Sequence, residues 1–145
     1  MSRTIVLLVA AAGCAGPSAE IRAGRLGAEQ EGMATYYSPR LAGHHTANGE
    51  RYDPARFTAA HPAIPFGTHV QVTRTDDSQR TAIVRINDRC SGKKKIIDVS
   101  EAAARQLDMM RAGIVPVRIR VVAEAPSPAS LRDAASPHFV GRGGK

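Results

Sequence analysis

The stretch RINDRC, at residues 85–90, places four polar or reactive side chains directly after an alternating apolar strand. Asp88 is the most informative of them, because a carboxyl group that leaves the hydrophobic core at a strand end is partly desolvated. Desolvation disfavours the charged form, and a carboxylic acid that keeps its proton can donate it near neutral pH. Asp88 is therefore a candidate general acid. The alternative is a structural aspartate that caps a turn through side-chain hydrogen bonds.

Two further polar stretches could supply partners for this carboxyl group. In HHTANGERYD (44–53), Glu50 follows a tight Asn-Gly turn, where an exposed carboxylate should stay ionised and stabilise positive charge. In TAAHPAIPFGT (58–68), His61 follows small residues, and prolines stiffen the chain behind it. The alternatives are a solvated turn residue for Glu50 and a hydrogen-bonded structural histidine for His61.

Other conspicuous residues predict little chemistry. His44 and His45 are adjacent, so in a strand they would point to opposite faces and would not share a metal ion. Two cysteines are too few for a zinc cluster. The lysine run at 93–95 is interpreted as a solvated loop, and Cys90 as a packed thiol. We therefore expect neither a metal nor a cofactor.

The elements that must position these residues are mostly strands. Residues 68–75 and 80–86 both alternate apolar and polar side chains, and the DDSQ turn between them predicts a hairpin. Residues 115–122 alternate valine and isoleucine with outward arginines, and residues 32–38 form a plausible first strand. Several short strands with few helices predict an all-β protein built as a small closed barrel.

One helix is clear and a second is brief. Ser100 can cap the segment SEAAARQLDMM, Glu101 complements the helix dipole in the first turn, and Gly113 lies just beyond the end. The segment YDPARF (52–57) predicts a single helical turn, because aspartate precedes proline at its start.

The length of the chain predicts one domain. Its N-terminus predicts an exported protein, and the segments on either side of the domain are predicted to be flexible. A short basic and apolar N-terminus leads to Cys14 after AAG, which is typical of a lipoprotein signal peptide over residues 1–14 with a lipidated Cys14. The alternative is a secretory signal cleaved elsewhere, and a Cys14–Cys90 disulfide could then form. Residues 15–30 are interpreted as a tether, 31–122 as the folded domain and 123–145 as a disordered tail.

The charge balance is basic, with 20 Lys and Arg against 13 Asp and Glu, a net charge of +7. Such a field attracts polyanions in general and does not choose among them. The sequence has no tryptophan, three tyrosines and three phenylalanines. Few aromatic rings argue against single-stranded nucleic acid, whose binding proteins stack bases on such rings.

The motifs TANGE, AAH, IPFGT, NDR and IIDVS, in this order over residues 31–122, resemble the rare lipoprotein A family. The resemblance implies a six-stranded double-psi β-barrel with one or two short helices, flanked here by disordered N- and C-terminal segments. It also implies lytic transglycosylase action on peptidoglycan, which breaks the MurNAc–GlcNAc β-1,4 bond and leaves 1,6-anhydro ends. A sequence departure follows NDR, where the family commonly has Gly-Pro and this chain has Cys90 and Ser91.

The resemblance assigns roles residue by residue. Asp88 matches the acidic catalytic position, Glu50 a second functional carboxylate, and His61 a histidine beside them across a glycan groove. We expect Asn87, Arg89 and Asn48 to bind substrate, with Arg89 placed to bind the lactyl carboxylate of muramic acid.

The expected setting is the cell envelope. The partners are peptidoglycan strands and, through the lipid anchor, a membrane facing the periplasm (the outer membrane if there is one). We expect a monomer without nucleic acid. Two alternatives remain: a non-catalytic glycan-binding or wall-loosening module of the expansin kind, and a basic polyanion-binding protein.

Overall fold

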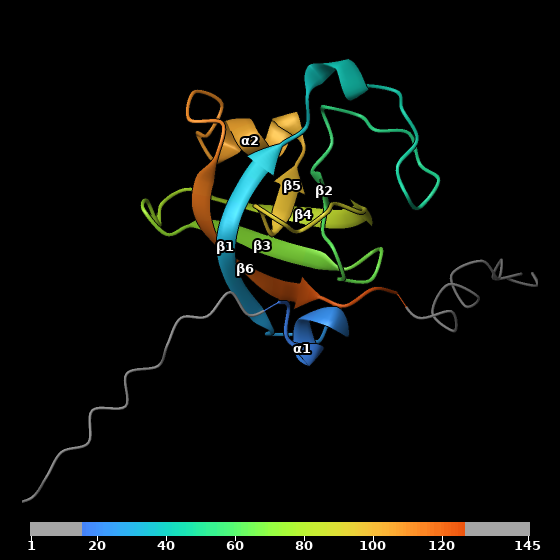
Figure 1. Cartoon of the computed structure of the whole chain (residues 1–145), viewed down its shortest axis with the longest axis vertical. Helices are drawn as coiled ribbons and strands as arrows, with labels where there is room; N and C mark the ends of the chain where they lie inside the picture. Colours follow the sequence, from blue (N-terminus) through green and yellow to red (C-terminus); the bar gives the residue numbers. More distant parts are fainter. Residues whose placement is uncertain (1–15, 127–145) are drawn as a thin grey trace, which may run out of the picture.

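The computed structural model describes residues 16–126, and these form a closed six-stranded barrel (Figure 1). The strands are β1 (Glu29–Tyr36), β2 (Thr58–Ala60), β3 (His69–Arg74), β4 (Thr81–Asp88), β5 (Ile97–Val99) and β6 (Val115–Ala123). Around the barrel they follow the order β1-β5-β2-β4-β3-β6. The pairs β1–β5 and β2–β4 are parallel and the other pairs are antiparallel. This architecture confirms the predicted all-β double-psi barrel.

The core follows the predicted alternation of the long strands. Val70 and Val72 of β3 are fully buried, and the predicted hairpin with β4 is present with Val70 opposite Val84. In β6 the inward residues Val117, Ile119 and Val121 are buried, whereas the arginines between them are exposed. Burial of a branched apolar side chain stabilises the fold by about 1.5–3 kcal/mol, so these three strands supply much of the core.

The predicted capped helix is α2 (Glu101–Gln106), drawn above the barrel in Figure 1. The Ser100 side chain accepts a hydrogen bond from the Ala103 amide, as the cap predicts. The helix is shorter than the sequence pattern suggests, because Asp108 adopts a left-handed conformation with φ of 52°. Residues 52–57 form a turn and not a helix, and a short 3-10 helix, η1 (Pro39–Leu41), stands outside the predicted elements.

The predicted tether over residues 15–30 is wrong for most of its length. Ser18 caps a short helix, α1 (Ala19–Arg22), in which Ile21 is fully buried, at the end of the barrel opposite α2 (Figure 1). The Gly27 amide then donates to the Val121 carbonyl, and β1 begins at Glu29. The cause is the single isoleucine: its burial anchors a segment whose composition otherwise resembles a linker.

The predicted tail is ordered at its start. β6 runs to Ala123, and the Glu124 carboxylate accepts a hydrogen bond from the Leu26 amide. Cys14, the predicted lipidation site, and residues 127–145 lie outside the described residues.

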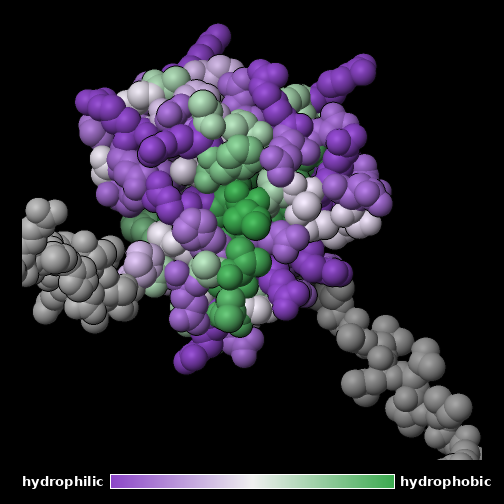
Figure 2. All heavy atoms as spheres, turned by 180° about the vertical axis from the view of Figure 1, so that it is seen from behind, coloured by the Kyte–Doolittle hydropathy of each residue, from purple (hydrophilic) through white to green (hydrophobic). Residues whose placement is uncertain are grey.

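The face of the molecule shown in Figure 2 is mainly hydrophilic. Figure 2 shows the face opposite to that of Figure 1, where polar side chains surround a central apolar stripe. Within residues 16–126, no helix is long and apolar enough to cross a membrane.

Candidate functional site

The carboxyl end of β4 places Asp88 at the surface beside β2. Ala59 of β2 lies opposite Ile86, but Ala60 lies opposite Asp88, so the register shifts and β4 bulges at Asn87. A bulge turns side chains away from the regular alternation. Asn87 is consequently buried, and Asp88 follows it as a half-buried residue at the barrel rim.

Three donors fix the orientation of the Asp88 carboxyl group. Its Oδ1 accepts hydrogen bonds from the amides of Ala47 and Arg89, both at 2.8 Å. Its Oδ2 accepts one from the Tyr37 hydroxyl at 2.6 Å. Each carboxylate oxygen has two acceptor positions. Among residues 16–126, both positions on Oδ1 are therefore filled, and Oδ2 keeps one for another partner.

Tyr37 is a site residue that was not predicted from the sequence. Its side chain is nearly buried, and its ring lies 4.6 Å from the ring of Tyr52. Burial, followed by the hydrogen bond to Asp88, raises the pKa of Tyr37 far above its usual range. The hydroxyl therefore keeps its proton and acts as a neutral donor and acceptor beside Asp88.

Glu50 forms an ion pair with Arg85, a second residue that was not predicted from the sequence. Two parallel hydrogen bonds join them, from Arg85 Nη1 to Oε1 at 2.9 Å and from Nη2 to Oε2 at 2.8 Å. The hydrogen bonds from Arg85, and next the one from Asn87, lower the pKa of Glu50 to about 2. The Glu50 carboxylate is thus ionised at neutral pH, as the sequence predicted, with 39% of its side chain exposed.

A tight loop carries Glu50 and contacts Asp88. The Asn48 side-chain oxygen accepts hydrogen bonds from the Thr46 hydroxyl at 2.7 Å and the Glu50 amide at 3.1 Å. Gly49 adopts a φ of 90°, which only glycine tolerates easily. The backbone amide of Asn48 also donates to the backbone carbonyl of Asn87. The loop is therefore attached to β4, and the Asn48 oxygen is used to shape the loop.

Asn87 does not occupy the position expected of a sugar-binding residue. It is 2% exposed, and its amide nitrogen donates to Glu50 Oε2 at 3.1 Å. Its side-chain oxygen is buried without a hydrogen-bond partner in the described part of the chain. Asn87 therefore helps to hold the Glu50 carboxylate in place from the buried side. The bulge is the reason that the Asn87 side chain points inward.

His61 directly follows β2, and its backbone amide donates to the Asp88 carbonyl at 3.2 Å, but its side chain does not face Asp88 across a groove as expected. Its side chain is fully buried, and Nδ1 accepts hydrogen bonds from the amides of Ala63 and Ile64, both at 3.0 Å. The proton is therefore on Nε2, which lies 3.2 Å from the Gln30 side-chain oxygen. Burial, and next the charge of Arg89, lowers the pKa of His61 to about 4. His61 is a positioning residue for the turn that it begins.

Arg89 also holds this turn. Its Nη1 donates to the carbonyl of Ile64 at 2.8 Å and to that of His61 at 3.2 Å. Its guanidinium lies 3.9 Å from the centre of the Phe66 ring, a distance at which the cation is attracted to the ring face. These contacts differ from the expected free guanidinium that awaits a substrate carboxylate.

Asp98 in β5 is a further carboxylate on the same side of the barrel. Ala60 lies opposite Asp98 on one side and Asp88 on the other, so the two aspartates flank β2. Two strand spacings separate them by about 10 Å. The Thr35 hydroxyl and the Lys95 ammonium both bind the Asp98 carboxylate. Asp98 belongs to the IIDVS motif, so the sequence pointed to this carboxylate, but its contacts with Thr35 and Lys95 could not be predicted.

The remaining reactive group is a thiol. Cys90 is a free, half-buried cysteine whose Sγ lies 3.6 Å from the Ala60 carbonyl. Desolvation raises the pKa of Cys90, which disfavours the nucleophilic thiolate. Among residues 16–126, no group of three or more His, Cys, Asp or Glu side chains could hold a metal ion.

The arrangement is suited to proton transfer by a single carboxyl group. Asp88 is oriented by its neighbours and has one open acceptor position at the surface. The ionised Glu50 adds fixed negative charge on a loop that contacts Asp88 through Ala47. A carboxyl group that can give and retake a proton, beside a fixed carboxylate, fits general acid–base catalysis on a bond whose cleavage develops positive charge.

Curated relatives share this part of the chain. The Endolytic peptidoglycan transglycosylase RlpA of Vibrio cholerae is 42% identical over 97 residues, which are 66% of this chain and 36% of the relative. The protein of the same name from Helicobacter pylori is 43% identical over 98 residues, or 67% of this chain and 31% of the relative. This chain thus spans only about a third of the length of these relatives.

Solved structures share the barrel. The Streptomyces papain inhibitor is similar with a TM-score of 0.55 and 26% identity, over 68% of this chain and 97% of that one. The expansin of Clavibacter michiganensis has a TM-score of 0.53 and 26% identity, over 69% of this chain and 53% of that one. A family model described as lytic transglycolase matches residues 29–119, which are more than half of the chain. On this match, which includes every residue of the site described above, the chain belongs to the lytic transglycolase family.

Proposed function

We propose that this domain is an endolytic peptidoglycan lytic transglycosylase that breaks the MurNAc–GlcNAc β-1,4 bond and forms 1,6-anhydro-muramic ends. One observation carries the proposal: Asp88 is oriented by three donors and keeps one acceptor position at the surface. The family and the names of the relatives supply the reaction class and substrate. Carbohydrate binding by a similar barrel is illustrated by the Clavibacter michiganensis expansin in complex with cellohexaose.

The hydrogen bonds to Asp88 favour one of its two oxygens, Oδ2, as the proton carrier in the proposed reaction. A proton on Oδ1 would displace one of two backbone amides, which have fixed positions. Oδ2 instead faces the Tyr37 hydroxyl, which can rotate and serve as donor or acceptor. In the proposed reaction, protonated Oδ2 therefore gives its proton to the glycosidic oxygen. It then takes the proton of the sugar's own 6-hydroxyl as that oxygen attacks the anomeric carbon.

The nucleophile is part of the substrate, so the site has no water to activate. An attached nucleophile reacts within one molecule, which lowers the entropic cost of the reaction. Glu50, held ionised by Arg85, stabilises the positive charge that develops on the sugar ring. This role needs a fixed charge and no second proton carrier.

The test of the acid role is an Asp88→Asn substitution in the full chain. The amide is the same size, so the fold and glycan binding should persist, while release of anhydro-muropeptides should fall by about 10²–10⁴-fold. Product release is followed by chromatography, and binding is measured on the same preparations, with the unsubstituted chain as the reference. Undiminished product release by the Asp88→Asn variant would remove Asp88 from the chemistry.

A non-catalytic role in glycan binding or wall loosening is the second candidate. It is favoured by the likeness to an expansin at a TM-score of 0.53. The two candidates separate on products: a binding module would retain glycan without releasing any new chain end.

We also propose the cell envelope as the location, with Cys14 as a lipid anchor to a membrane. The motivation is the sequence AAGC at the end of the apolar N-terminus. A Cys14→Ser variant should move from the membrane fraction to the soluble fraction when the native chain is expressed in a bacterium. Mass spectrometry that found an unmodified Cys14 thiol in the mature protein would contradict the anchor.

A further inference from the structure

A hollow on the outside of β2, β3 and β4 adjoins the site without taking part in the proton transfer. It has a volume of about 520 Å³ and is lined by Arg56, Phe57, Thr58, His69, Ile83 and Arg85. We refer to these six residues as the lateral hollow.

The lateral hollow is connected to the site through Arg85. This side chain lines the hollow and holds the Glu50 carboxylate in two hydrogen bonds. Arg85 of β4 lies opposite Thr58 of β2 on one side and opposite His69 of β3 on the other. The hollow therefore extends across all three strands, with β4 at its centre. Asp88 follows three residues further along β4, a distance of about 10 Å. A short oligosaccharide bound at Asp88 therefore reaches the hollow.

The walls of the hollow include unusually exposed apolar groups. Phe57 is 41% exposed and Ile83 is 53% exposed, and both belong to the short set of large apolar side chains that the described surface leaves open. A ligand pocket combines such apolar walls with a few polar groups. An exposed aromatic ring offers a flat apolar face, which matches the apolar C–H face of a pyranose ring.

The charge of the hollow is positive and comes from Arg56. Glu50 occupies the guanidinium of Arg85 in a bidentate ion pair, so Arg85 is not open to a second carboxylate. Arg56 is exposed and forms no ion pair or side-chain hydrogen bond within residues 16–126. A guanidinium group of this kind binds a carboxylate through two parallel hydrogen bonds. The hollow thus combines a ring-stacking surface with one open carboxylate-binding group.

We propose that the lateral hollow is a glycan subsite for an amino sugar that carries a carboxylate, placed away from the bond that Asp88 cleaves. Phe57 stacks on the sugar ring and Arg56 binds the carboxylate. This inference rests on the proposed function for the identity of the glycan. The carboxylate belongs either to the ether-linked group of muramic acid or to a peptide attached to it.

The test measures glycan binding by calorimetry in the Asp88→Asn background, in which turnover is suppressed. Three probes of equal glycan length are used: a neutral N-acetylglucosamine oligomer, an alternating oligomer with muramic acid but no peptide, and the same oligomer with its peptides. Arg56→Ala should weaken binding of at least one of the two carboxylated oligomers about tenfold, or 1.4 kcal/mol, and leave the neutral oligomer unaffected. Phe57→Ala should weaken all three by about the same factor.

Matched controls lie outside the hollow. Arg111→Ala removes another exposed arginine, and Ile114→Ala removes an apolar side chain that is 45% exposed; both should bind every probe like the parent. A loss with Arg56→Ala that is confined to the peptide-bearing oligomer would assign the carboxylate to the peptide. A loss confined to the peptide-free muramic acid oligomer would assign it to the sugar, because that carboxyl group becomes an amide when a peptide is attached. A loss with both oligomers would mean that Arg56 accepts either carboxylate.

Unchanged affinities of Arg56→Ala and Phe57→Ala for all three probes would overturn the subsite. This result would leave the proposed function intact, because product release by the chain with Asp88 is measured separately. Conversely, a chain that binds glycan through the hollow but releases no anhydro ends would retain the subsite and lose the proposed reaction.

Discussion

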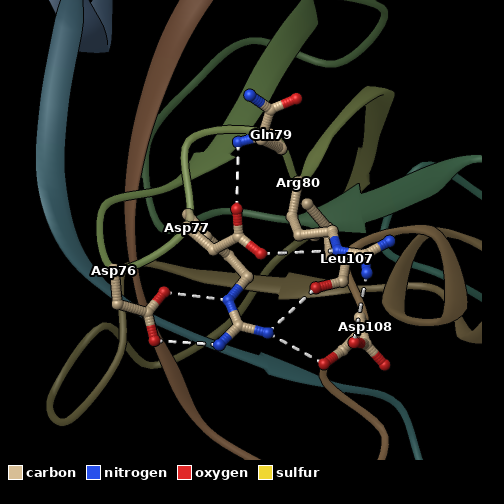
Figure 3. Close-up of polar contacts among 7 residues, drawn as sticks. Asp76, Asp77, Gln79, Arg80, Leu107 and Asp108 are labelled. Atoms are coloured by element: carbon tan, nitrogen blue, oxygen red, sulfur yellow. Dashed lines mark hydrogen bonds and ion pairs between the residues drawn. The ribbon is translucent and has the colours of Figure 1, made fainter.

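Two arginine–carboxylate clusters stand at opposite ends of β4. One joins Arg85 to Glu50 near Asp88, at the strand's carboxyl end. The other joins Arg74 to Asp76, across the hairpin at the strand's amino end, and we call it the hairpin cluster (Figure 3). Both use a bidentate pair of the same chemistry, so their different surroundings decide what each can do.

In the hairpin cluster, Arg74 donates four hydrogen bonds within the protein. Besides Asp76, Arg74 donates to the carbonyls of Leu107 and Asp108, at 3.2 and 2.8 Å. Arg80 pairs with Asp77 and Asp108, which ties the hairpin to the turn after α2 (Figure 3). Each carboxylate oxygen of Asp76 also keeps an acceptor position among the described residues, but the hydrogen bond from Arg74 lowers the pKa of Asp76. This carboxylate therefore stays ionised, and the role of the cluster is to fasten the hairpin.

The Arg85–Glu50 pair, by contrast, fastens a loop that contacts a reactive group. The loop donates the Ala47 amide to Asp88, and Asp88 Oδ2 keeps an open acceptor position among the described residues. It follows that a bidentate ion pair does not mark a functional site by itself. The feature that marks the proposed site is the Asp88 carboxyl group beside the pair, which keeps an open acceptor position among the described residues.

Among the changes that compare the two clusters, the strongest effect should come from Arg85→Ala. This change frees Glu50 and loosens the loop that orients Asp88, so anhydro-end release should fall by about 10²–10³-fold, the effect of losing one preorganised electrostatic contact. Arg85→Lys keeps the charge but not the parallel pair, so it should restore little. Product release by liquid chromatography checks this, with circular dichroism as the control for folding. Full activity in Arg85→Lys would mean that charge alone suffices.

The second effect is a loss of folding stability at acid pH, which comes from two residues near the carboxyl end of β4, His61 and Glu50. His61 binds a proton near pH 6.5 in the unfolded chain but only near pH 4 in the folded one, so stability is present above pH 6.5 and is lost as the pH falls toward 4. The loss corresponds to about 3 kcal/mol. Glu50, with a pKa lowered to about 2, adds a further loss only below about pH 4.5.

Urea unfolding between pH 7 and 4 measures this loss. His61→Asn retains a side-chain oxygen for the two amides but cannot take up the proton, so its stability should vary much less over this interval. An equally steep loss in His61→Asn would place the acid sensitivity elsewhere in the chain.

The third effect belongs to the hairpin cluster. Arg74→Ala removes a mostly buried guanidinium with its charged hydrogen bonds, and should lower the free energy of unfolding by about 1–2 kcal/mol. Activity at a temperature where the protein is folded should be unchanged. Arg111→Ala, an exposed arginine without these contacts, is the matched control. A loss of activity in folded Arg74→Ala would show that the hairpin cluster influences the site.

The weakest effect is expected from Tyr37→Phe. This change removes the hydrogen bond to Asp88 Oδ2 but keeps the ring beside Tyr52. One hydrogen bond of this kind contributes about 1 kcal/mol, so activity should fall several-fold and not by orders of magnitude. Initial rates over a range of substrate concentrations measure it. A loss as large as that of Asp88→Asn would instead give Tyr37 a direct part in proton transfer.

The sequence predicts the parts of this fold that have a long pattern. The β3–β4 hairpin and β6 show sustained alternation, and α2 shows a cap. The strands β2 and β5 have three residues each, too few for a pattern, although β5 contains Asp98 and β2 pairs with both Asp88 and Asp98. Their place in the barrel depends on pairing with distant strands, which local sequence does not encode.

The candidate site was predictable in its residue types but not in its contacts. Asp88 and Glu50 stand in recognisable motifs, yet the Tyr37 and Arg85 side chains that hold them come from elsewhere in the chain. The bulge that turns Asn87 inward is a feature of strand pairing. His61 shows the limit most clearly, because a histidine in a motif is equally consistent with an exposed base and with the buried acceptor observed.

The proposed mechanism requires that Asp88 transfers a proton while the substrate supplies its own nucleophile. Digestion of purified glycan strands in ¹⁸O-labelled water, with mass spectrometry of the new ends, tests both parts at once. We expect anhydro ends that contain no solvent oxygen, and about 10²–10⁴-fold less of these products from Asp88→Asn. Reducing ends labelled with ¹⁸O would show attack by water, and would contradict the mechanism by making the enzyme a hydrolase.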